Sequence, residues 1–479
     1  MRPPSPATFR DAAPLRTALA AVLGDGAVDD ELLGEAGPLG RPLAADGLTI
    51  GNRFAVHPME GWDGEPDGRP SAATRRRWRR FGESGAKLVG GGEAFAVSPD
   101  GRANPNQLHL NDALDPRPGL EALLDELRGG HREACGTVDG LVVGLQLTHS
   151  GRYARPSVAG AAPRVMFRHP VLDARVGLED DAAVLADSDL DRIAERFVRA
   201  AAVAREVGFD FVDVKACHGY LLHESLAARR RPGRFGGDLA GRSALLTGIV
   251  RAVRDACPGL RVGVRMSVTD VFPHARGPDG VGAPLGRDEH RPYDAGFGVD
   301  PDDPLRPDLD EPLRVIGLLR DLGVRMLNVT AGSPYTSPHL QRPAVFPPSD
   351  GYASPGDPLA FVARHLDVTR RVKAAFPDLL VVGTGYSYLQ EWIPHVAQHE
   401  VGRGHVDVVG LGRSMLSYPA LCRDVLAGRP LDAKRICRTF SDCTTGPRHG
   451  LPSGCYPLDP EYRARPEAAE IRKLRRRNG

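Results

Sequence analysis

Three side chains that handle protons lie close together in the segment FDFVDVKACHGY, residues 209–220. Lys215 carries an ammonium group, His218 an imidazole and Tyr220 a phenol, and all three follow an apolar stretch directly. Each of these groups can donate a hydrogen bond or a proton to a substrate. A buried strand that ends in such residues indicates a catalytic site at the end of that strand.

Glycines follow two apolar stretches near the end of the chain. Gly383 and Gly385 lie in LLVVGTGYS, and Gly412 precedes Arg413 in HVDVVGLGRS. Backbone amides beside glycine can surround a phosphate, and an arginine can pair with it. A phosphorylated cofactor is therefore a candidate ligand, although glycine turns of this kind also end many ordinary strands.

The elements that must position these residues alternate regularly along the chain. Continuous apolar character indicates parallel strands buried on both faces. Eight segments have it: 48–58, 86–94, 141–149, 209–216, 260–267, 323–330, 379–385 and 405–412. Helical spacing separates them, as in residues 188–208 and 358–376. The alternation predicts an α/β fold, a (β/α)8 TIM barrel with its site at the carboxyl ends of the strands.

A doubly wound sheet is the alternative to the barrel. That layout usually has fewer strands, and a glycine-rich dinucleotide turn follows its first strand. Here the first strand is followed by PMEGWDGEPDG, residues 58–68. The barrel is therefore the preferred prediction.

Three regions lie outside the repeat or interrupt it. Residues 1–46 form an N-terminal extension, expected to include a helix that closes the bottom of the barrel, which spans residues 47–432. Residues 433–479 form a short C-terminal extension, expected to pack against the barrel. Residues 272–310, rich in Gly, Pro and Asp, predict a long loop after strand five on the catalytic face. The segment TRRRWRRFGE, residues 74–83, is expected to form an exposed helical face.

The bulk composition excludes several classes of protein. The chain has 479 residues, and its 62 basic and 61 acidic side chains give a formal charge of +1, too small to favour nucleic acid or an anionic membrane. No apolar run approaches the roughly 18–20 residues that span a bilayer, and no secretory core opens the chain. Seven scattered cysteines predict reduced thiols. We expect a cytoplasmic protein with a small-molecule substrate, with no nucleic-acid or membrane partner and with homo-oligomer formation left open.

Seven motifs together resemble one known family. NRFAVHPM, GEAFAVSPDGR, QLTHSGR, HGYLLHE, RFGGDLAGR, VGVRMS and VVGLGRSMLSYPAL occur in the order seen in the old yellow enzyme family of flavin-dependent NAD(P)H oxidoreductases. The resemblance covers residues 47–427. It implies a TIM barrel that binds FMN non-covalently at its carboxyl face. It also implies hydride transfer from NADH or NADPH to flavin N5 and then to an activated alkene, the reaction of an ene-reductase.

The resemblance also assigns residues to the flavin. Gln146 would hydrogen-bond the pyrimidine edge, and Arg265 would face N1 and O2, where a fixed cation favours reduction. The other positions are expected to contact the ring or hold the phosphate: Pro58, Met59, Glu60, Ala94, Gly383, Gly385, Tyr386, Gly412 and Arg413. The alternatives are an ordinary buried amide for Gln146 and a structural ion pair for Arg265.

Catalytic roles follow from the same resemblance. Relatives hold the oxygen of an enone or nitro group with two imidazoles, or with a His and an Asn, at the positions of Lys215 and His218. Two donors draw electron density toward that oxygen and make the β-carbon a better hydride acceptor. Tyr220 matches the proton donor, which would protonate the α-carbon.

Lys215 and Glu60 depart from the family pattern. An ammonium is a mobile point charge, so Lys215 is a candidate to bind an anionic oxygen of the substrate. Glu60 stands near a position where relatives often have Thr or Cys, and a carboxylate there would oppose flavin reduction unless it is protonated or paired. One hypothesis is a coupled Glu60–Lys215 pair beside the flavin. The alternatives pair Lys215 structurally with Glu60 or Asp213, or turn Glu60 away so that Trp62 covers the flavin edge.

The C-terminal extension raises the question of a metal. Larger members of the family carry a four-cysteine iron–sulfur cluster just after the barrel. Cys437, Cys443 and Cys455 match the first, third and fourth of those ligands, but Phe440 stands at the second. Three thiolates do not complete the usual set. We therefore expect no metal and no iron–sulfur cluster.

Other functions remain open alternatives. The same flavin site could run in the oxidative direction, as a dehydrogenase, oxidase or amine-cleaving enzyme on a specialised metabolite. A lyase or aldolase could use Lys215 as a Schiff-base nucleophile on the same barrel. A non-catalytic flavin-binding module is disfavoured because Tyr220 and His218 are both present.

Overall fold

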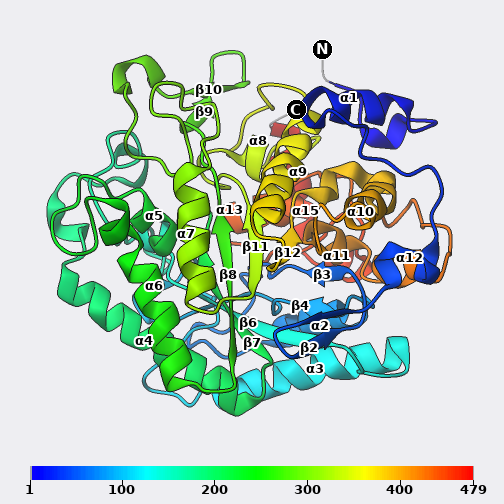
Figure 1. The fold of residues 1–479 in the computed structure, drawn as a ribbon, viewed down its shortest axis with the longest axis horizontal. Coiled ribbons are helices and arrows are strands. Elements are labelled where there is room, and N and C mark those ends of the chain that lie inside the picture. Colours follow the sequence, from blue (N-terminus) through cyan, green and yellow to red (C-terminus); the bar gives the residue numbers. More distant parts are fainter. Residues whose placement is uncertain (1–2, 478–479) are drawn as a thin grey trace.

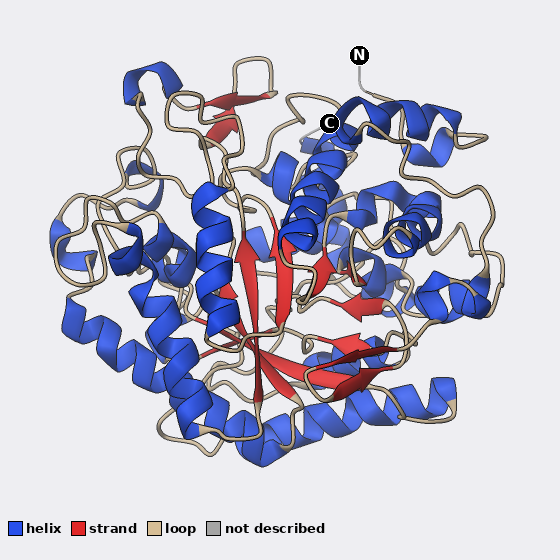
Figure 2. Cartoon of the chain, viewed as in Figure 1, coloured by secondary structure: helices blue, strands red, loops and turns tan. Residues whose placement is uncertain are grey.

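The computed structural model describes residues 3–477, and a closed ring of parallel strands lies at its centre (Figures 1 and 2). The ring follows the order β4-β3-β13-β12-β11-β8-β7-β6, and a pairing of β4 with β6 closes it. Its strands are β3 (Phe54–Val56), β4 (Leu88–Val89), β6 (Val142–Thr148), β7 (Phe211–Ala216), β8 (Arg261–Ser267), β11 (Met326–Thr330), β12 (Leu380–Gly383) and β13 (Val408–Leu411). Each lies within one predicted apolar segment, which confirms the TIM barrel. A short strand, β5 (Ala94–Ala96), pairs with β6 beyond β4.

Helices between the strands cover the outside of the ring (Figure 1). They are α2 (Ala72–Gly82), α3 (Arg117–Cys135), α4 (Asp187–Val207), α6 (Leu239–Ala256), α7 (Asp310–Asp321), α9 (Pro358–Ala375), α10 (Ile393–Gly402), α11 (Arg413–Ser417) and α12 (Leu421–Leu426). In α4 the buried side chains recur every three or four residues, so one face packs on the barrel. Gly208 ends this helix with φ of 93°, a left-handed conformation that glycine adopts without strain.

A β-hairpin closes the bottom of the barrel. Its strands, β1 (Leu43–Ala45) and β2 (Leu48–Ile50), pair antiparallel and join β3 directly. Ile50 is fully buried in the lower layer of inward-facing side chains. The predicted closing helix is therefore wrong: α1 (Ala13–Leu23) packs against α9 on the outside, where its buried Leu15 and Leu19 find a partner.

The long polar segment after β8 is partly ordered by its own contacts. It contains an antiparallel hairpin of β9 (His274–Arg276) and β10 (Gly282–Pro284), seen at the top of Figure 1. Phe272, Phe297 and Val299 are buried in the main core. These apolar residues anchor a segment whose composition predicted only a loop.

The C-terminal extension packs against the barrel, as predicted. It holds α13 (Asp442–Arg448), α14 (Pro460–Ala464) and α15 (Glu467–Arg477), and its own buried cluster includes Tyr456, Tyr462 and Ile471. The Ser453 amide donates to the Gly61 carbonyl at 2.6 Å, and Arg76 pairs with Asp459 at 2.9 Å. The extension is thereby fixed beside the loop that follows β3.

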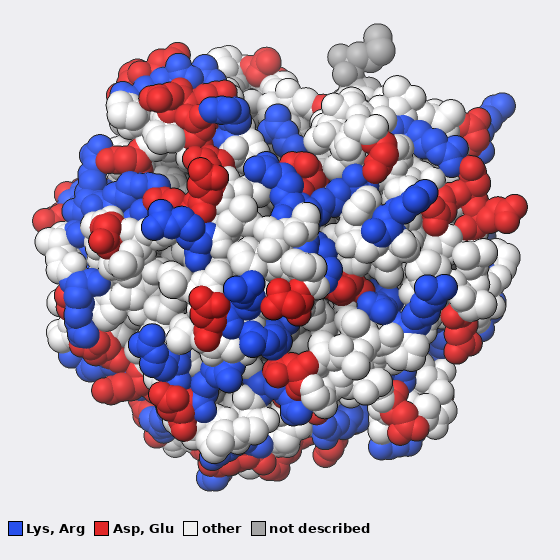
Figure 3. All heavy atoms as spheres, viewed as in Figure 1, with Lys and Arg blue, Asp and Glu red and all other residues white. Residues whose placement is uncertain are grey.

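The surface agrees with the neutral composition. Figure 3 shows basic and acidic side chains interspersed over the visible face. Among residues 3–477, no helix has both the length and the apolar character needed to cross a membrane.

Candidate active site

A cavity of about 240 Å³ opens at the carboxyl ends of the barrel strands. Most of the predicted site residues line it: Pro58, Met59, Glu60, Ala94, Gln146, Lys215, His218, Tyr220, Arg265, Gly385, Gly412 and Arg413. Gly383 and Tyr386 are absent from this lining, because the Tyr386 side chain is buried beside Gly383, behind the wall. His274, His290 and Tyr293, from the loop after β8, do not line it either. The ends of separate strands thus bring together residues far apart in the sequence.

Glu60 is the centre of a hydrogen-bonded group at one end of the cavity. The Tyr220 hydroxyl donates to Glu60 Oε1 at 2.9 Å, and Lys215 Nζ lies 3.4 Å from the same oxygen. The Tyr220 and Tyr335 hydroxyls are 3.1 Å apart. Lys215 Nζ also lies over the Tyr220 ring, 3.9 Å from its centroid. Lys215 and Glu60 are therefore in contact, as both the coupled-pair hypothesis and the structural alternative require, and the role of the pair stays a prediction.

Burial controls protonation at this end of the cavity. It raises the pKa of Tyr220 well above its usual value, and the neighbouring Glu60 carboxylate adds to the effect. It also lowers the pKa of His218 well below its usual value, helped by the nearby Arg265 and Lys215 charges. At neutral pH the phenol keeps its proton and the imidazole is neutral. Tyr220 is thus a proton donor, and His218 is a hydrogen-bonding group without charge.

The backbone turns sharply to present these side chains. His218 has φ of 65°, in the left-handed region that non-glycine residues seldom occupy. The His218 amide donates to the Ser267 hydroxyl at 3.0 Å, and the Ser333 hydroxyl donates to the His218 carbonyl at 2.8 Å. The imidazole Nε2 lies 3.2 Å from the Gln341 amide nitrogen. Contacts from β8 and from the loop after β11 therefore hold a strained backbone in place.

Gln146 and Arg265 lie on neighbouring parts of the cavity floor. Gln146 Nε2 donates to Asp213 Oδ2 at 2.7 Å across the β6–β7 pairing, and burial raises the pKa of Asp213 to about 6. The Arg265 guanidinium is buried, forms no ion pair with any residue from 3 to 477, and leaves Nε without a hydrogen bond. The structural ion pair considered for Arg265 is therefore wrong. A buried cation without a partner indicates a place for a ligand that carries negative charge.

Arg342 and Arg413 form the opposite end of the cavity. Arg413 donates to the Pro343 carbonyl at 2.8 Å, and Arg342 donates to the Thr444 hydroxyl. Each guanidinium keeps one buried nitrogen without a hydrogen bond in the described chain. Burial, and then the charge of Arg413, lowers the pKa of Arg342 to about 10. Two adjacent cations that lack an acidic partner suit a dianionic group such as a phosphate.

A buried ion cluster holds the segment after β3 against the cavity. Arg77 contacts both Asp63 Oδ1 and Glu93 Oε2 at 2.6 Å and donates to the Met59 carbonyl. The expectation of an exposed helical face is therefore wrong in part, because Arg77 and Trp78 are buried while Arg75 is exposed. Burial lowers the pKa of Arg77, but the two carboxylates outweigh it, so the net shift is upward. The arginine fixes the backbone of Met59, which lines the cavity.

Several lining residues were missed by the sequence analysis. Tyr335 stacks on Tyr153, with ring centroids 3.9 Å apart, and the Arg448 guanidinium lies 4.9 Å from the Tyr335 centroid. The C-terminal extension supplies one wall, through Cys443, Thr444, Pro447, Arg448 and Ser453. The residues of the extension lie far from any strand end in the sequence, and Tyr335 lies in the loop after β11 without a motif that marks it.

The three cysteines of the extension, Cys437, Cys443 and Cys455, lie near enough to influence one another electrostatically, whereas Phe440 packs against other residues. Cys443 lines the cavity, while the Phe440 ring lies 5.9 Å from that of Phe346 and under the Arg475 guanidinium. Burial raises the pKa of the Cys437 and Cys443 thiols above the usual value. Phe440 thus packs as an apolar residue at the place of a cluster ligand. The absence of a metal at these cysteines stays a prediction.

Comparison with known proteins gives the same picture. The model of the NADH:flavin oxidoreductase / NADH oxidase family matches residues 38–278. The chain is 24% identical over 404 residues to the NADH-dependent flavin oxidoreductase iliE of Neonectria sp. (strain DH2), covering 80% of this chain and 46% of that protein. It is 29% identical over 245 residues to the NADPH dehydrogenase of Geobacillus thermodenitrificans (strain NG80-2), covering 48% and 64% respectively. The chain therefore spans about half to two thirds of the length of these relatives.

Solved structures show the same fold at low sequence identity. The 2-naphthoyl-CoA reductase complex with 2-naphthoyl-CoA superimposes with a TM-score of 0.66 and 16% identity, over 91% of this chain and 58% of that one. Histamine dehydrogenase from Rhizobium sp. 4-9 gives a TM-score of 0.61 and 18% identity, over 88% and 52%. These likenesses confirm the barrel and exclude the doubly wound sheet.

Proposed function

Because this chain belongs to the NADH:flavin oxidoreductase / NADH oxidase family, we propose that it binds FMN in the cavity and reduces an activated C=C bond with NADH or NADPH. The observation that carries the proposal is Tyr220, a buried phenol that keeps its proton and lies in the same cavity as the unpaired Arg265 guanidinium. When bound, FMN supplies the hydride that it receives from the nicotinamide.

The donor set of the cavity fits FMN. Arg342 and Arg413 would hold the phosphate, together with backbone amides near Gly385 and Gly412. Arg265 would face the part of the ring where negative charge accumulates on reduction, and the free oxygen of the Gln146 amide would accept a hydrogen bond. Three buried polar atoms that lack a partner, on Arg265, Arg342 and Arg413, are the atoms that such a ligand would satisfy.

The substrate end supplies the groups that an alkene reduction needs. His218 and Lys215 would hold the carbonyl or nitro oxygen, and Tyr220 would give its proton to the α-carbon. The resulting phenolate would be stabilised by Lys215 Nζ, 3.9 Å from the ring centroid, and by the Tyr335 hydroxyl at 3.1 Å. Glu60 and Tyr335 connect the Tyr220 oxygen to the rest of the cavity, so a lost proton can be replaced along this network.

A second candidate is the oxidative direction, and one observation favours it. The Tyr220 hydroxyl already donates to Glu60, whose carboxylate is paired with Lys215. A carboxylate in this position could receive a proton from a substrate through Tyr220, as dehydrogenation of an amine or alcohol requires. The same ion pair weakens the Schiff-base hypothesis, because a paired ammonium is protonated and not nucleophilic.

Anaerobic half-reactions test the proposal. We expect the purified chain to be yellow and NADH or NADPH to bleach its flavin band. Enones or nitroalkenes should then restore the band faster than amines or alcohols bleach the oxidised enzyme. Bleaching of the oxidised enzyme by amines or alcohols, without recovery by any alkene, would support the oxidative direction instead. A colourless chain that takes up no FMN would refute both.

A further inference from the structure

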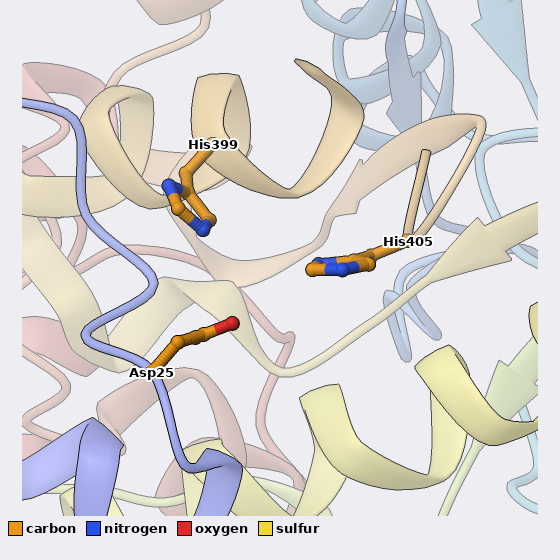
Figure 4. Close-up of side chains that lie close together, drawn as sticks. All are labelled: Asp25, His399 and His405. Atoms are coloured by element: carbon orange, nitrogen blue, oxygen red, sulfur yellow. The ribbon is translucent and has the colours of Figure 1, made fainter. Parts of the chain in front are cut away.

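A second cluster of potential ligands lies away from the cavity, where the N-terminal extension meets α10. Asp25 follows α1, His399 is on α10 and His405 precedes β13, and the three converge in Figure 4. One ligand atom from each lies within 4.8 Å of the other two, and none of the three lines the cavity. We propose that these residues bind a divalent transition-metal ion of the zinc class, which fastens the N-terminal extension to the barrel.

The surroundings of the two imidazoles support metal binding. His399 Nδ1 lies within hydrogen-bonding distance of Asp29 Oδ1, at 3.0 Å, whereas His405 Nδ1 lies 3.6 Å from Glu400 Oε2 and has no hydrogen-bond partner among the described residues. Metal-binding histidines usually direct the second ring nitrogen to a carboxylate, which fixes the tautomer and raises the basicity of the ligand. For His399, a proton on Nδ1 would leave the Nε2 lone pair for the metal, and His405 keeps a buried ring nitrogen without a partner among the described residues.

The charge around the cluster favours a divalent cation. Asp25, Asp29 and Glu400 are three carboxylates, whereas Arg370 is the guanidinium that pairs with two of them. The formal charges of these four groups sum to −2. A divalent ion would balance them, and neutral imidazoles are the form that binds metals.

Arg370 leaves Asp25 available as a ligand. Its two terminal nitrogens lie 3.0 Å from the two Asp25 oxygens, which occupies one side of the carboxylate. The Ala27 amide also donates to Asp25 Oδ1, at 3.1 Å. An ionised carboxylate has about four lone-pair sites, so one site on Oδ2 is left to bind a metal. The Asp25 side chain is also 45% exposed, so it can rotate and a water can complete the coordination.

The donor types and spacing select the class of ion. Donor atoms around a tetrahedral zinc with bonds of roughly 2.0–2.1 Å lie about 3.4 Å apart. The present limit of 4.8 Å therefore needs only small side-chain rotations. Two imidazoles and one carboxylate suit Zn²⁺, Co²⁺ or Ni²⁺, whereas Ca²⁺ and Mg²⁺ prefer an all-oxygen shell.

The ion would strengthen an attachment that already exists. The Asp29 amide donates to the His395 carbonyl at 3.3 Å, and His395 Nδ1 lies 2.9 Å from the Asp29 carbonyl. A metal that joins Asp25 to His399 and His405 would add a link from the segment after α1. The proposed role is structural, and it does not depend on the flavin reaction.

Zinc titration of the EDTA-treated, flavin-loaded chain tests the proposal. We expect one Zn²⁺ per chain by calorimetry and by metal analysis, with at least roughly 100-fold weaker binding in His399→Ala and in His405→Ala. Zn²⁺ should also slow trypsin cleavage of the N-terminal extension in the unchanged chain. His449→Ala is the control, since it removes an exposed histidine of the C-terminal extension outside the cluster and should keep the zinc.

Two further variants keep the result interpretable. His405→Gln, checked by circular dichroism, replaces His405→Ala if that variant does not fold. Cys437→Ser tests the thiols of the C-terminal extension and should leave the stoichiometry unchanged. No zinc binding below millimolar concentration, or zinc lost in Cys437→Ser but kept in both histidine variants, would overturn the proposal.

Discussion

The two ends of the cavity differ in how far the chain satisfies its own polar groups. At the Tyr220 end, the Tyr220 hydroxyl, the Glu60 carboxylate and the Lys215 ammonium contact one another within 3.4 Å. At the Arg413 end, Arg342 and Arg413 each keep a buried nitrogen without a partner among the described residues, and the charge of Arg413 adds to burial in lowering the pKa of Arg342. Tyr220, Glu60 and Lys215 thus have partners within the chain, whereas each of the two arginines keeps a nitrogen that an anion could satisfy.

This difference separates two tasks of the site. Buried like charges are unfavourable unless a counter-charge arrives, so the arginine end gives up stability that cofactor binding restores. Groups that already contact one another lose little further freedom when a substrate binds. Under the proposed function, the Tyr220 end already has the geometry for proton transfer, and the arginine end would gain its counter-charge from the cofactor.

Loss of the proton donor gives the largest expected effect. Tyr220→Phe should lower the rate of flavin reoxidation by an alkene about 100- to 10,000-fold, because the α-carbon then loses its positioned acid. FMN content and the rate of reduction by NAD(P)H should stay close to those of the unchanged enzyme. Stopped-flow measurement of the two half-reactions checks this. A slowed reductive half-reaction with an unchanged oxidative one would contradict the role of Tyr220.

Removal of a cation from the arginine end should act on the cofactor instead. Arg413→Leu should weaken FMN binding roughly 200- to 1,000-fold, since a buried phosphate loses its counter-charge. Fluorescence titration of the apoprotein with FMN and with riboflavin measures the effect, and riboflavin, which lacks the phosphate, should be little affected. Arg429→Leu, at an exposed arginine paired with Asp424 at 2.6 Å, is the control. Equal losses for FMN and riboflavin would argue against a phosphate site here.

The smallest expected effect comes from Asp213, which accepts a hydrogen bond from Gln146 on the cavity floor. It is a pH dependence of the free energy of unfolding. Burial raises the pKa of Asp213 from 3.8 to about 6, so between these pH values the folded chain keeps a proton that the unfolded chain has lost. The free energy of unfolding should therefore fall by about 2 kcal/mol as the pH rises from about 4 to about 6. Asp213→Asn should remove this contribution. Urea unfolding of both proteins across that range measures the difference, and parallel profiles would disprove it.

The sequence was most informative where chemistry lies at strand ends. Lys215 lies near the end of β7, and Tyr220 and Arg413 follow strands whose apolar character is continuous, so a barrel places all three at one face. Arg342 and Tyr335 belong to the same cavity, but they lie in the loop after β11, where nothing local distinguishes them from surface residues. Their roles arise from contacts with Thr444, Arg448 and Tyr220, which only the folded chain brings near.

The charge pattern of residues 74–83 led to a prediction that is wrong in part, because one of its charged residues is buried with its acidic partners. Arg77 lies in an arginine-rich helix whose pattern favours solvent, yet Asp63 and Glu93 neutralise it inside the protein. Both acids come from other segments, so the pairing is invisible in a helical repeat. The hairpin that closes the bottom of the barrel was not predicted. Its two strands, within residues 43–50, are too short to show periodicity in the sequence.

The wall that residues 443–453 contribute to the cavity has an evolutionary consequence. The reacting groups belong to the barrel, while part of the cavity's outline belongs to a peptide appended after it. Mutations in residues 443–453 can therefore change which substrates fit the cavity without altering the reacting groups. A library randomised only in this stretch would be a short route to altered selectivity.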